Sequence, residues 1–245
     1  MRRRRSGGSE MIEAVVFDMD GVLFDTERLS CESCFEASAQ LGLSVTKEAV
    51  YGCFGLNAAD AREHVLSSME WAYPGKSFPY DVYRSRHDEL FAARIQKELP
   101  EKPGVRALLE FLKGRGVRMA VASSSRYERV ADNLSRSGLA SYFDQVLGGD
   151  MVEHSKPLPD IYLMACRQLG VNPSCAAAVE DSPNGIRSAR AAGMLAVMVP
   201  DLIQPGPELE GQFDLKFESL TEFRRYLEGA QNWGGKPKTA EKDRV

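Results

Sequence analysis

The chain has 245 residues, with 31 basic and 35 acidic side chains and a formal net charge of −4. This near balance offers no basic surface for nucleic acid, and no apolar run reaches the ~18 residues of a membrane span. The five cysteines are scattered along the chain, which favours reduced, buried thiols, so we expect a soluble, cytoplasmic protein that binds neither nucleic acid nor membrane.

The two ends of the chain have the composition of tails. Four arginines at positions 2–5 are followed by the flexible spacer Ser6-Gly7-Gly8-Ser9. These arginines could contact anions, but the run is isolated. Residues 231–245 are polar and contain Gly234-Gly235. We expect residues 1–10 and 231–245 to be flexible segments outside the folded part.

The first element is a short apolar run, Ile12 and residues 14–17, which predicts a strand buried on both faces of a sheet. It ends at Asp18 and Asp20, followed by Gly21. Side chains alternate along a strand, so the two carboxylates point the same way. Two anions on one side need a cation or a shared proton, and oxygen ligands suit Mg²⁺.

Three interpretations of this segment compete. A solvated acidic turn is the simplest. A calcium-binding loop would place Val16 where the first acidic ligand must stand, and would need a helix where the sequence predicts a strand. The third interpretation is a nucleophilic aspartate that takes up a phosphoryl group, with the second aspartate as acid and base.

Residues 28–98 form a helical block without a convincing strand. The apolar spacing predicts helices over 28–43, from an N-cap at Asn57 to the break at Tyr73-Pro74-Gly75, and over 80–97. Trp71, at the end of the second helix, could stack on a sugar but is more typical of a core residue. We expect this block to be a separate unit.

After Pro103, strands alternate with helices of about ten residues. This alternation is typical of a doubly wound, parallel α/β sheet with a Rossmann-like core, and the strand at 12–17 should belong to the same sheet. We therefore predict a core of residues 11–27 and 99–230 and an inserted α-helical cap of residues 28–98. The predicted strands are 117–122, 145–147, 176–179, 195–199 and 214–217, and the predicted helices end near 112, 136, 169, 192 and 228.

Two further segments carry polar groups that could reach the same edge of the predicted sheet. Ser123-Ser124-Ser125 follows the strand at 117–122, where hydroxyl and backbone N–H groups can cradle a phosphate or simply cap a helix. Lys156 precedes a helix between a turn and two prolines, where it could hold a phosphate and a carboxylate or lie on the surface.

Glu180 and Asp181 follow the strand at 176–179 and permit the same metal argument as Asp18. Asp181 could instead cap the next helix. Because the carboxyl ends of parallel strands meet at one edge, these groups together with Lys156 would supply a nucleophile, an acid/base, a phosphate clamp and metal ligands.

These motifs resemble those of the haloacid dehalogenase-like superfamily of aspartyl-phosphate enzymes, over roughly residues 11–228. The inserted helical block is similar to the small cap of its β-phosphoglucomutase-like subgroup. The motifs are Asp18-Met19-Asp20-Gly21-Val22-Leu23-Phe24-Asp25-Thr26-Glu27, Ser123, Lys156-Pro157-x-Pro159-Asp160 and Glu180-Asp181-Ser182-x-Asn184-Gly185.

The resemblance implies roles for individual residues. Asp18 attacks phosphorus, and Asp20 protonates the leaving oxygen and then activates water. Ser123 and Lys156 hold the phosphoryl oxygens, with Ser124 beside them. Mg²⁺ is the implied cofactor, and its implied ligands are Asp18, the backbone carbonyl of Asp20, Asp181 and, directly or through water, Glu180.

Departures from the subgroup's pattern favour a phosphatase over a mutase. The mutases have a histidine where this chain has Ser30, and an arginine three residues beyond a cap glycine; if that glycine is Gly55, the position is Ala58. Arg126 keeps one basic group near the site, so a β-phosphoglucomutase-like mutase stays an alternative. A non-catalytic phosphate-binding protein is a second alternative.

The cap should set specificity by closing over the substrate. The residues expected to face the cleft from the cap are Ser30, Gly55, Leu56 and Asn57. Few cationic groups are evident there, which suggests a small sugar or polyol monophosphate. The expected partner is a small phosphorylated metabolite, and the expected oligomeric state is a monomer.

Overall fold

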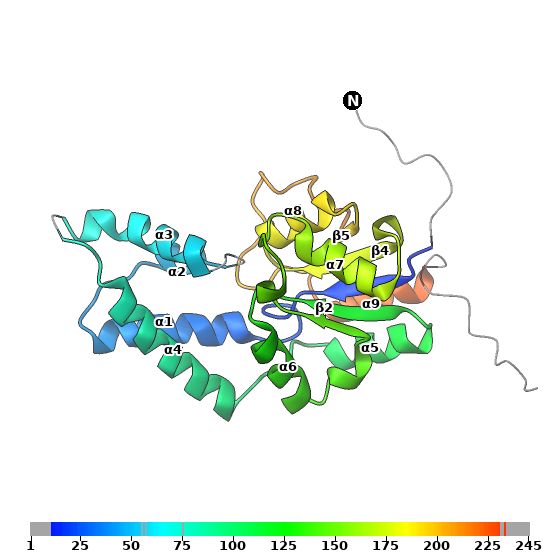
Figure 1. Cartoon of the computed structure of the whole chain (residues 1–245), viewed down its shortest axis with the longest axis horizontal. Helices are drawn as coiled ribbons and strands as arrows, with labels where there is room; N and C mark the ends of the chain where they lie inside the picture. Colours follow the sequence, from blue (N-terminus) through cyan, green and yellow to red (C-terminus); the bar gives the residue numbers. More distant parts are fainter. Residues whose placement is uncertain (1–10, 55, 57, 75, 231–232, 234–245) are drawn as a thin grey trace, which may run out of the picture.

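The computed structural model describes residues 11–54, 56, 58–74, 76–230 and 233. The chain forms two parts, a parallel sheet covered by helices and a block of helices beside it, which Figure 1 shows on the left. We call this block of helices the cap, and the sheet with its helices the core. The strands are β1 (Ala14–Phe17), β2 (Arg118–Ala122), β3 (Gln145–Leu147), β4 (Ala176–Glu180), β5 (Leu195–Met198) and β6 (Leu215–Lys216).

The six strands are parallel, in the order β3-β2-β1-β4-β5-β6. Val16 of β1 pairs with Ala120 of β2 on one side and Ala178 of β4 on the other. The predicted doubly wound α/β fold with an inserted helical cap is therefore confirmed. Strand order reverses at β1, and the crevice at the carboxyl edge of such a point is where open α/β folds bind ligands.

Helices cover both faces of the sheet, which explains the unbroken apolar run of the first strand. Val15 and Phe17 face one apolar cluster together with α5, α6 and α9. Ala14 and Val16 face a second cluster with α7 and α8. The core helices are α5 (Val105–Gly114), α6 (Tyr127–Arg136), α7 (Asp160–Leu169), α8 (Pro183–Ala191) and α9 (Leu220–Gly229).

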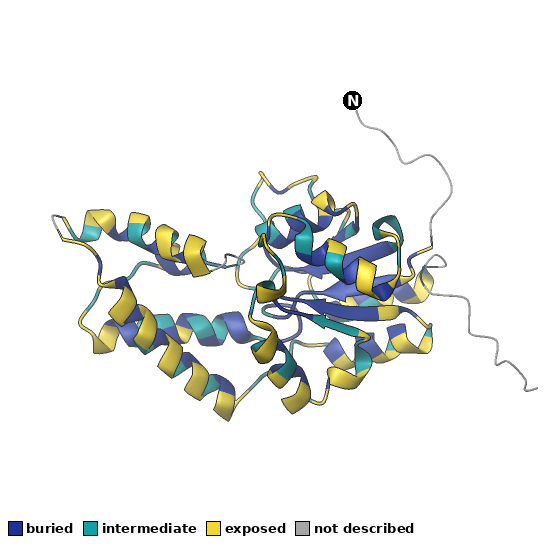
Figure 2. Ribbon diagram, in the orientation of Figure 1, coloured by how far each residue is buried: buried dark blue, intermediate teal, exposed yellow. Residues whose placement is uncertain are grey.

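The cap has an apolar cluster of its own, and Figure 2 shows buried stripes along its helices where they face one another. The cap helices are α1 (Thr26–Gln40), α2 (Lys47–Tyr51), α3 (Ala58–Met69) and α4 (Tyr80–Lys97). The sequence did not predict α2, a five-residue helix capped by the Thr46 side chain, which accepts from the N–H of Ala49 at 3.1 Å. The predicted cap Asn57 lies outside the described residues. The domain boundaries themselves stay a prediction.

Both tryptophans differ from expectation. Trp71 is 72% exposed, so its assignment to a core was wrong, and it does not line the pocket described below. Trp233 is 4% exposed, so the expectation of a polar tail was wrong at this residue. Its indole packs edge-on against Phe223 at 5.6 Å, and its backbone pairs with Ile12 beside the first strand. No helix among the described residues is both long and apolar enough to cross a bilayer.

The two tryptophans make a matched pair for a stability test. We expect Trp233→Ala to lower the free energy of unfolding by about 3–5 kcal/mol, because it empties a site in the core. Trp71→Ala should change it by no more than about 0.5 kcal/mol, because the side chain is exposed. Urea denaturation followed by circular dichroism measures both. Equal effects of the two substitutions would contradict the packing of Trp233.

Candidate active site

The loop after β1 turns tightly and aims two carboxylates into the crevice. The N–H of Asp18 donates to the carbonyl of Val179 at 3.0 Å, which continues the sheet by one residue. The N–H of Gly21 donates to the carbonyl of Phe24 at 2.9 Å, with Gly21 at φ +81°. A Cβ at Gly21 would overlap the carboxylate of Asp181, so both the backbone angle and the close approach require glycine here.

Lys156 joins three strand ends. It is 2% exposed, so the surface-lysine interpretation is wrong. Its ammonium donates to Asp18 Oδ1 and to Glu180 Oε1, both at 2.6 Å, and to the carbonyl of Ala122 at 3.0 Å. The structure therefore brings Lys156 within direct contact of Asp18, as the resemblance implied.

Glu180 is fully buried and orients the lysine. Its Oε1 also accepts from the hydroxyl of Tyr162 at 2.6 Å, and its Oε2 accepts from Ser182 Oγ at 3.1 Å. A Cβ at Gly185 would overlap this carboxylate, which gives a steric reason for the glycine that ends the fourth motif. Both oxygens of Glu180 therefore accept hydrogen bonds from neighbouring side chains.

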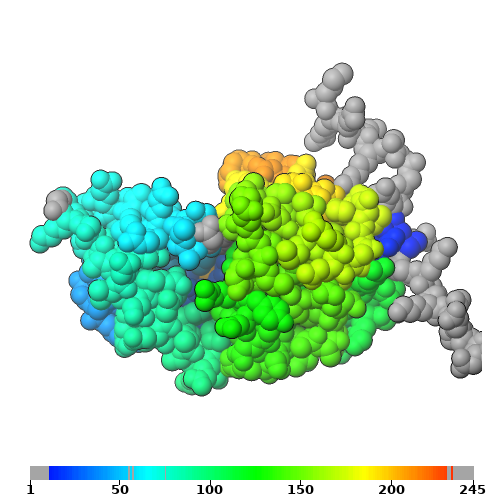
Figure 3. Space-filling view, in the orientation of Figure 1, coloured from blue at the N-terminus to red at the C-terminus, as the bar shows by residue number. Residues whose placement is uncertain are grey.

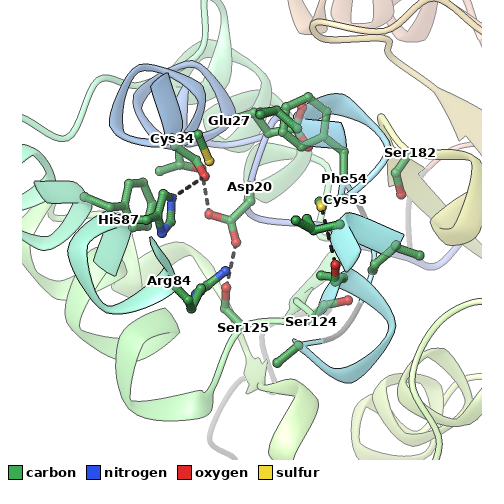
Figure 4. Close-up of a pocket in the computed structure, with 18 of the residues that line it drawn as sticks. Asp20, Glu27, Cys34, Cys53, Phe54, Arg84, His87, Ser124, Ser125 and Ser182 are labelled. Atoms are coloured by element: carbon green, nitrogen blue, oxygen red, sulfur yellow. Dashed lines mark hydrogen bonds between the residues drawn. The ribbon is translucent and has the colours of Figure 1, made fainter. Parts of the chain in front are cut away.

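Asp20 is held by hydroxyls and one arginine. It accepts from Thr26 Oγ1 at 2.6 Å, Ser125 Oγ at 2.8 Å and Arg129 Nη2 at 3.1 Å. Ser123 Oγ lies further away, at 3.4 Å. Figure 4 shows Asp20 and Ser125 pointing toward each other, with their hydrogen bond as a dashed line. The sequence reasoning missed Arg129, which lies within a helix after the serine loop.

The serine loop does not cap the helix that follows. Arg126 occupies the N-cap position of α6, and its side chain makes no capping hydrogen bond. Ser123 is 1% exposed, and its Oγ accepts from the N–H of Ser125 at 3.0 Å. Ser124 and Arg126 line the pocket. The loop thus turns toward the crevice, and its hydroxyls are available to the site.

A pocket of about 480 Å³ lies between the core and the cap. Figure 3 shows the surface hollowed where the two parts meet. The predicted cap residues Ser30 and Leu56 line it, whereas Gly55 and Asn57 lie outside the described residues. The core lines it with Asp18, Asp20, Ser123, Ser124, Ser125, Arg126, Arg129, Lys156, Asp181 and Ser182.

Helix α4 contributes polar groups to the pocket that the sequence reasoning missed. Arg84 lines the pocket, so the expectation of few cationic groups in the cap was incomplete; its guanidinium pairs with Asp88 at 2.9 Å. A ring nitrogen of His87 lies 3.1 Å from Ser30 Oγ. Figure 4 shows Arg84 and His87 on the side of the pocket nearest Asp20. His87 lies on the buried face of α4 with Tyr83 and Phe91, and a histidine on the apolar face of a predicted helix was the available signal.

Two groups of carboxylates share Asp181. Oxygens of Asp18, Glu180 and Asp181 lie within 4.8 Å of one another, and so do oxygens of Glu27, Asp181 and Asp201. Asp181 does not cap α8, because that position belongs to Ser182, whose Oγ accepts from the N–H at position 185. The structure thus gathers the predicted acidic residues at one edge of the sheet.

The comparison with known families agrees with this geometry. Residues 15–199 match the family described as "Haloacid dehalogenase-like hydrolase". The chain belongs to this family.

Individual relatives match over most of their length. The protein YhcW of Bacillus subtilis (strain 168) is 36% identical over 219 residues, which cover 89% of this chain and 96% of YhcW. A protein of Thermotoga maritima named "Phosphorylated carbohydrates phosphatase" is 33% identical, over 75% of this chain and 82% of its own. Structures of CbbY from Rhodobacter sphaeroides with phosphate and, as a mutant, with xylulose-(1,5)bisphosphate are both 32% identical, with TM-scores of 0.70. They cover 87% and 86% of this chain and 96% of their own.

Burial makes the acidic groups hard to ionise together. Burial raises the pKa of Asp18 from 3.8 to about 8; the ammonium of Lys156 opposes this rise, and the charge of Glu180 adds to it. Burial and the charge of Glu27 raise the pKa of Asp181 well above its usual range. Burial likewise raises the pKa of Glu27. The ammonium of Lys156 contacts only Asp18 and Glu180 among these acidic groups of the described residues.

The residues present fit a hard divalent cation. Burial alone would lower the pKa of Lys156, but the charges of Asp18 and Glu180 raise it overall, so the lysine stays charged. A single positive charge cannot balance Asp18, Glu180 and Asp181 together. Carboxylate oxygens are the ligands of hard cations, so a divalent ion among these carboxylates would remove the excess negative charge.

The pKa of Asp18 gives a pH-dependent metal test. Between about pH 4 and pH 8 the unfolded chain releases a proton that the folded, metal-free protein keeps, so the metal-free protein loses stability as pH rises through this range. Metal binding needs ionised carboxylates. We therefore expect the rise in Tm on adding Mg²⁺ to be larger at about pH 8 than at about pH 5.

Differential scanning calorimetry with Mg²⁺ and with EDTA measures this difference. Asp18→Asn should reduce its pH dependence, because asparagine does not ionise. A rise in Tm that is equal at both pH values, or larger at the acidic one, would contradict the assignment of buried, protonated carboxylates to the metal site.

Proposed function

We propose that the chain is a Mg²⁺-dependent phosphatase that hydrolyses a small sugar or polyol monophosphate through an aspartyl-phosphate at Asp18. The chain is a phosphoric monoester hydrolase; the metal, the intermediate and the substrate are our proposal. The observation that carries it is the buried contact of 2.6 Å between the Lys156 ammonium and Asp18 Oδ1. A buried carboxylate beside a fixed cation suits attack on a phosphate dianion.

In the proposed first step, an oxygen of Asp18 attacks phosphorus and the bond from phosphorus to the substrate oxygen breaks. The carboxyl of Asp20 supplies the proton that the leaving oxygen needs, so an alcohol departs. Hydrogen bonds from Thr26 and Ser125 hold Asp20 in place for this transfer. The product of the step is an acyl phosphate on Asp18.

In the proposed second step, water attacks the phosphorus of the acyl phosphate. Asp20, now a carboxylate, takes the water proton, and the bond between phosphorus and the Asp18 oxygen breaks. Inorganic phosphate leaves, and both aspartates return to their starting states. The same carboxyl thus acts first as acid and then as base.

Positioning and charge supply most of the help that a phosphoryl transfer needs. Lys156 and the hydroxyl and backbone groups of the Ser123 loop are proposed to hold the phosphoryl oxygens. Asp18, Asp181 and the backbone carbonyl of Asp20 would hold Mg²⁺, which when bound stabilises negative charge on the phosphoryl oxygens. Glu180 keeps Lys156 aimed at Asp18 through its own contact of 2.6 Å.

The size of the pocket supports a small substrate. Its volume of about 480 Å³ lies in the range of small-molecule sites. Of the arginines that line the pocket, Arg84 pairs with Asp88 and Arg129 pairs with Asp20. The name of the Thermotoga maritima relative supports a phosphorylated carbohydrate. One chain lines the pocket from both cap and core, which supports the proposal that it acts as a monomer. We also propose that it acts in the cytoplasm.

A sugar-phosphate mutase is the alternative that one observation favours. The sequence lacks a histidine at position 30, but His87 of α4 lies 3.1 Å from Ser30 Oγ. An imidazole therefore stands beside the position where the subgroup's mutases have one. A phosphatase releases phosphate to water, whereas a mutase must return it to a sugar, so the two are separable by their products.

The nucleophile has a direct test. We expect Asp18→Asn to lower hydrolysis of p-nitrophenyl phosphate with Mg²⁺ by at least about 10³-fold, because a neutral amide is a far weaker nucleophile than a carboxylate. The control is Asp81→Asn on the exposed side of α4, which should keep wild-type activity. Activity that survives in Asp18→Asn would contradict the mechanism. A wild-type protein that binds phosphate but hydrolyses nothing would favour the non-catalytic alternative.

The substrate class has a separate test. We expect release of inorganic phosphate from hexose and polyol monophosphates, with at least one of them preferred over p-nitrophenyl phosphate in kcat/KM. The control reaction supplies glucose 1-phosphate with glucose 1,6-bisphosphate as primer. Formation of glucose 6-phosphate there, together with no phosphate release in the screen, would establish the mutase instead.

A further inference from the structure

Arg129 lies between the acid/base carboxylate and the cap. It belongs to α6 of the core, and its Nη2 donates to Asp20 Oδ1 at 3.1 Å. Its guanidinium carbon lies 4.6 Å from the ring centre of Phe91, which belongs to cap helix α4. A cation over an aromatic ring is attracted to its face. One side chain therefore contacts the core carboxylate and a cap ring at once.

The position of the Phe91 ring is set by the cap. Phe91 is 9% exposed and packs in an apolar cluster with Leu29 and Ile95. The imidazole of His87 stacks on the ring at 5.6 Å with an angle of 17°. His87 in turn lies 3.1 Å from Ser30 Oγ, on the first cap helix. The ring cannot move far without disturbing contacts on α1 and α4.

We propose that Arg129 is a positioning residue for Asp20, and that its contact with Phe91 makes the alignment of Asp20 depend on where the cap lies. This inference rests on the proposed function, because it assigns Asp20 the role of acid. The Asp20 carboxyl can point at the leaving oxygen only if its rotation is restricted. Arg129 restricts the Oδ1 side together with Thr26, and Ser125 restricts the Oδ2 side.

The chemistry of the leaving group separates positioning from general damage. The alkoxide that leaves a sugar or polyol phosphate is a strong base and needs a proton from Asp20. p-Nitrophenolate is a weak base and leaves without one. Because kcat/KM reports the steps up to departure of the leaving group, the comparison of the two substrates isolates the proton donation of the first step.

The experiment compares two arginines of the same helix. Arg136 of α6 also contacts the cap, through the backbone carbonyls of Ile95 and Gln96 at 2.7 and 3.1 Å. No hydrogen bond joins Arg136 to Asp20 among the described residues. Arg129→Met and Arg136→Met therefore each remove one arginine contact between core and cap, but only the first removes a donor to Asp20.

We expect Arg129→Met to lower kcat/KM for the best alkyl monophosphate of the screen by at least about 10-fold, since general acid catalysis contributes about 10²–10⁴-fold. The loss with p-nitrophenyl phosphate should stay below about 3-fold. Arg136→Met should leave the ratio of the two kcat/KM values at its wild-type value. Phe91→Leu, which keeps an apolar side chain, should shift the ratio in the same direction as Arg129→Met.

Three outcomes decide the matter, with Tm measured for each variant. If Arg129→Met leaves the ratio of the two kcat/KM values unchanged, with equal losses or none, the positioning role is overturned. If Phe91→Leu leaves this ratio unchanged, the alignment of Asp20 does not depend on the cap. This test stands even if Arg129→Met does not fold. Failure of the wild type to hydrolyse any phosphate would instead overturn the proposed function.

Discussion

The structure depends on one buried ammonium that two carboxylates share. Lys156 contacts Asp18 and Glu180 at 2.6 Å each, and these three groups come from three segments far apart in the chain. Burying charges costs free energy unless they are paired and hydrogen-bonded. The carbonyl of Ala122 and the hydroxyl of Tyr162 complete that pairing. The carboxyl ends of β1, β2 and β4 must therefore lie at the same edge, which a parallel sheet provides.

Close packing around these charges explains residues that do no chemistry. Gly21 and Gly185 each leave room for a carboxylate, of Asp181 and Glu180 respectively, and any side chain would push that carboxylate away. The first motif therefore specifies shape as much as reactivity. The excess of acidic groups is what makes the site suited to a divalent cation, because burial and the charge of Glu180 raise the pKa of Asp18 and a cation would offset both.

The fold and the centre of the site could be predicted from local sequence patterns, because strand ends and motifs are contiguous in the chain. The unbroken apolar run before Asp18 predicted a strand covered on both faces, and Val15 and Val16 do face opposite apolar clusters. Residues that act by tertiary contact could not be predicted. Trp233 follows a polar stretch, and nothing local indicates that it packs on Phe223. Arg129 sits among charged helix residues, and only the fold places it beside Asp20.

The same distinction separates the two parts of the pocket. The core side is built from strand ends, whose positions are fixed by hydrogen bonds between neighbouring strands, so short motifs describe it well. The cap side is built from helix faces, whose positions depend on how α1 and α4 pack. His87 shows the consequence: position 30 holds a serine, yet an imidazole from another helix lies 3.1 Å from its hydroxyl. Specificity in such a pocket follows from the packing of the cap helices. An inference from single aligned positions therefore misses groups that this packing brings to the substrate.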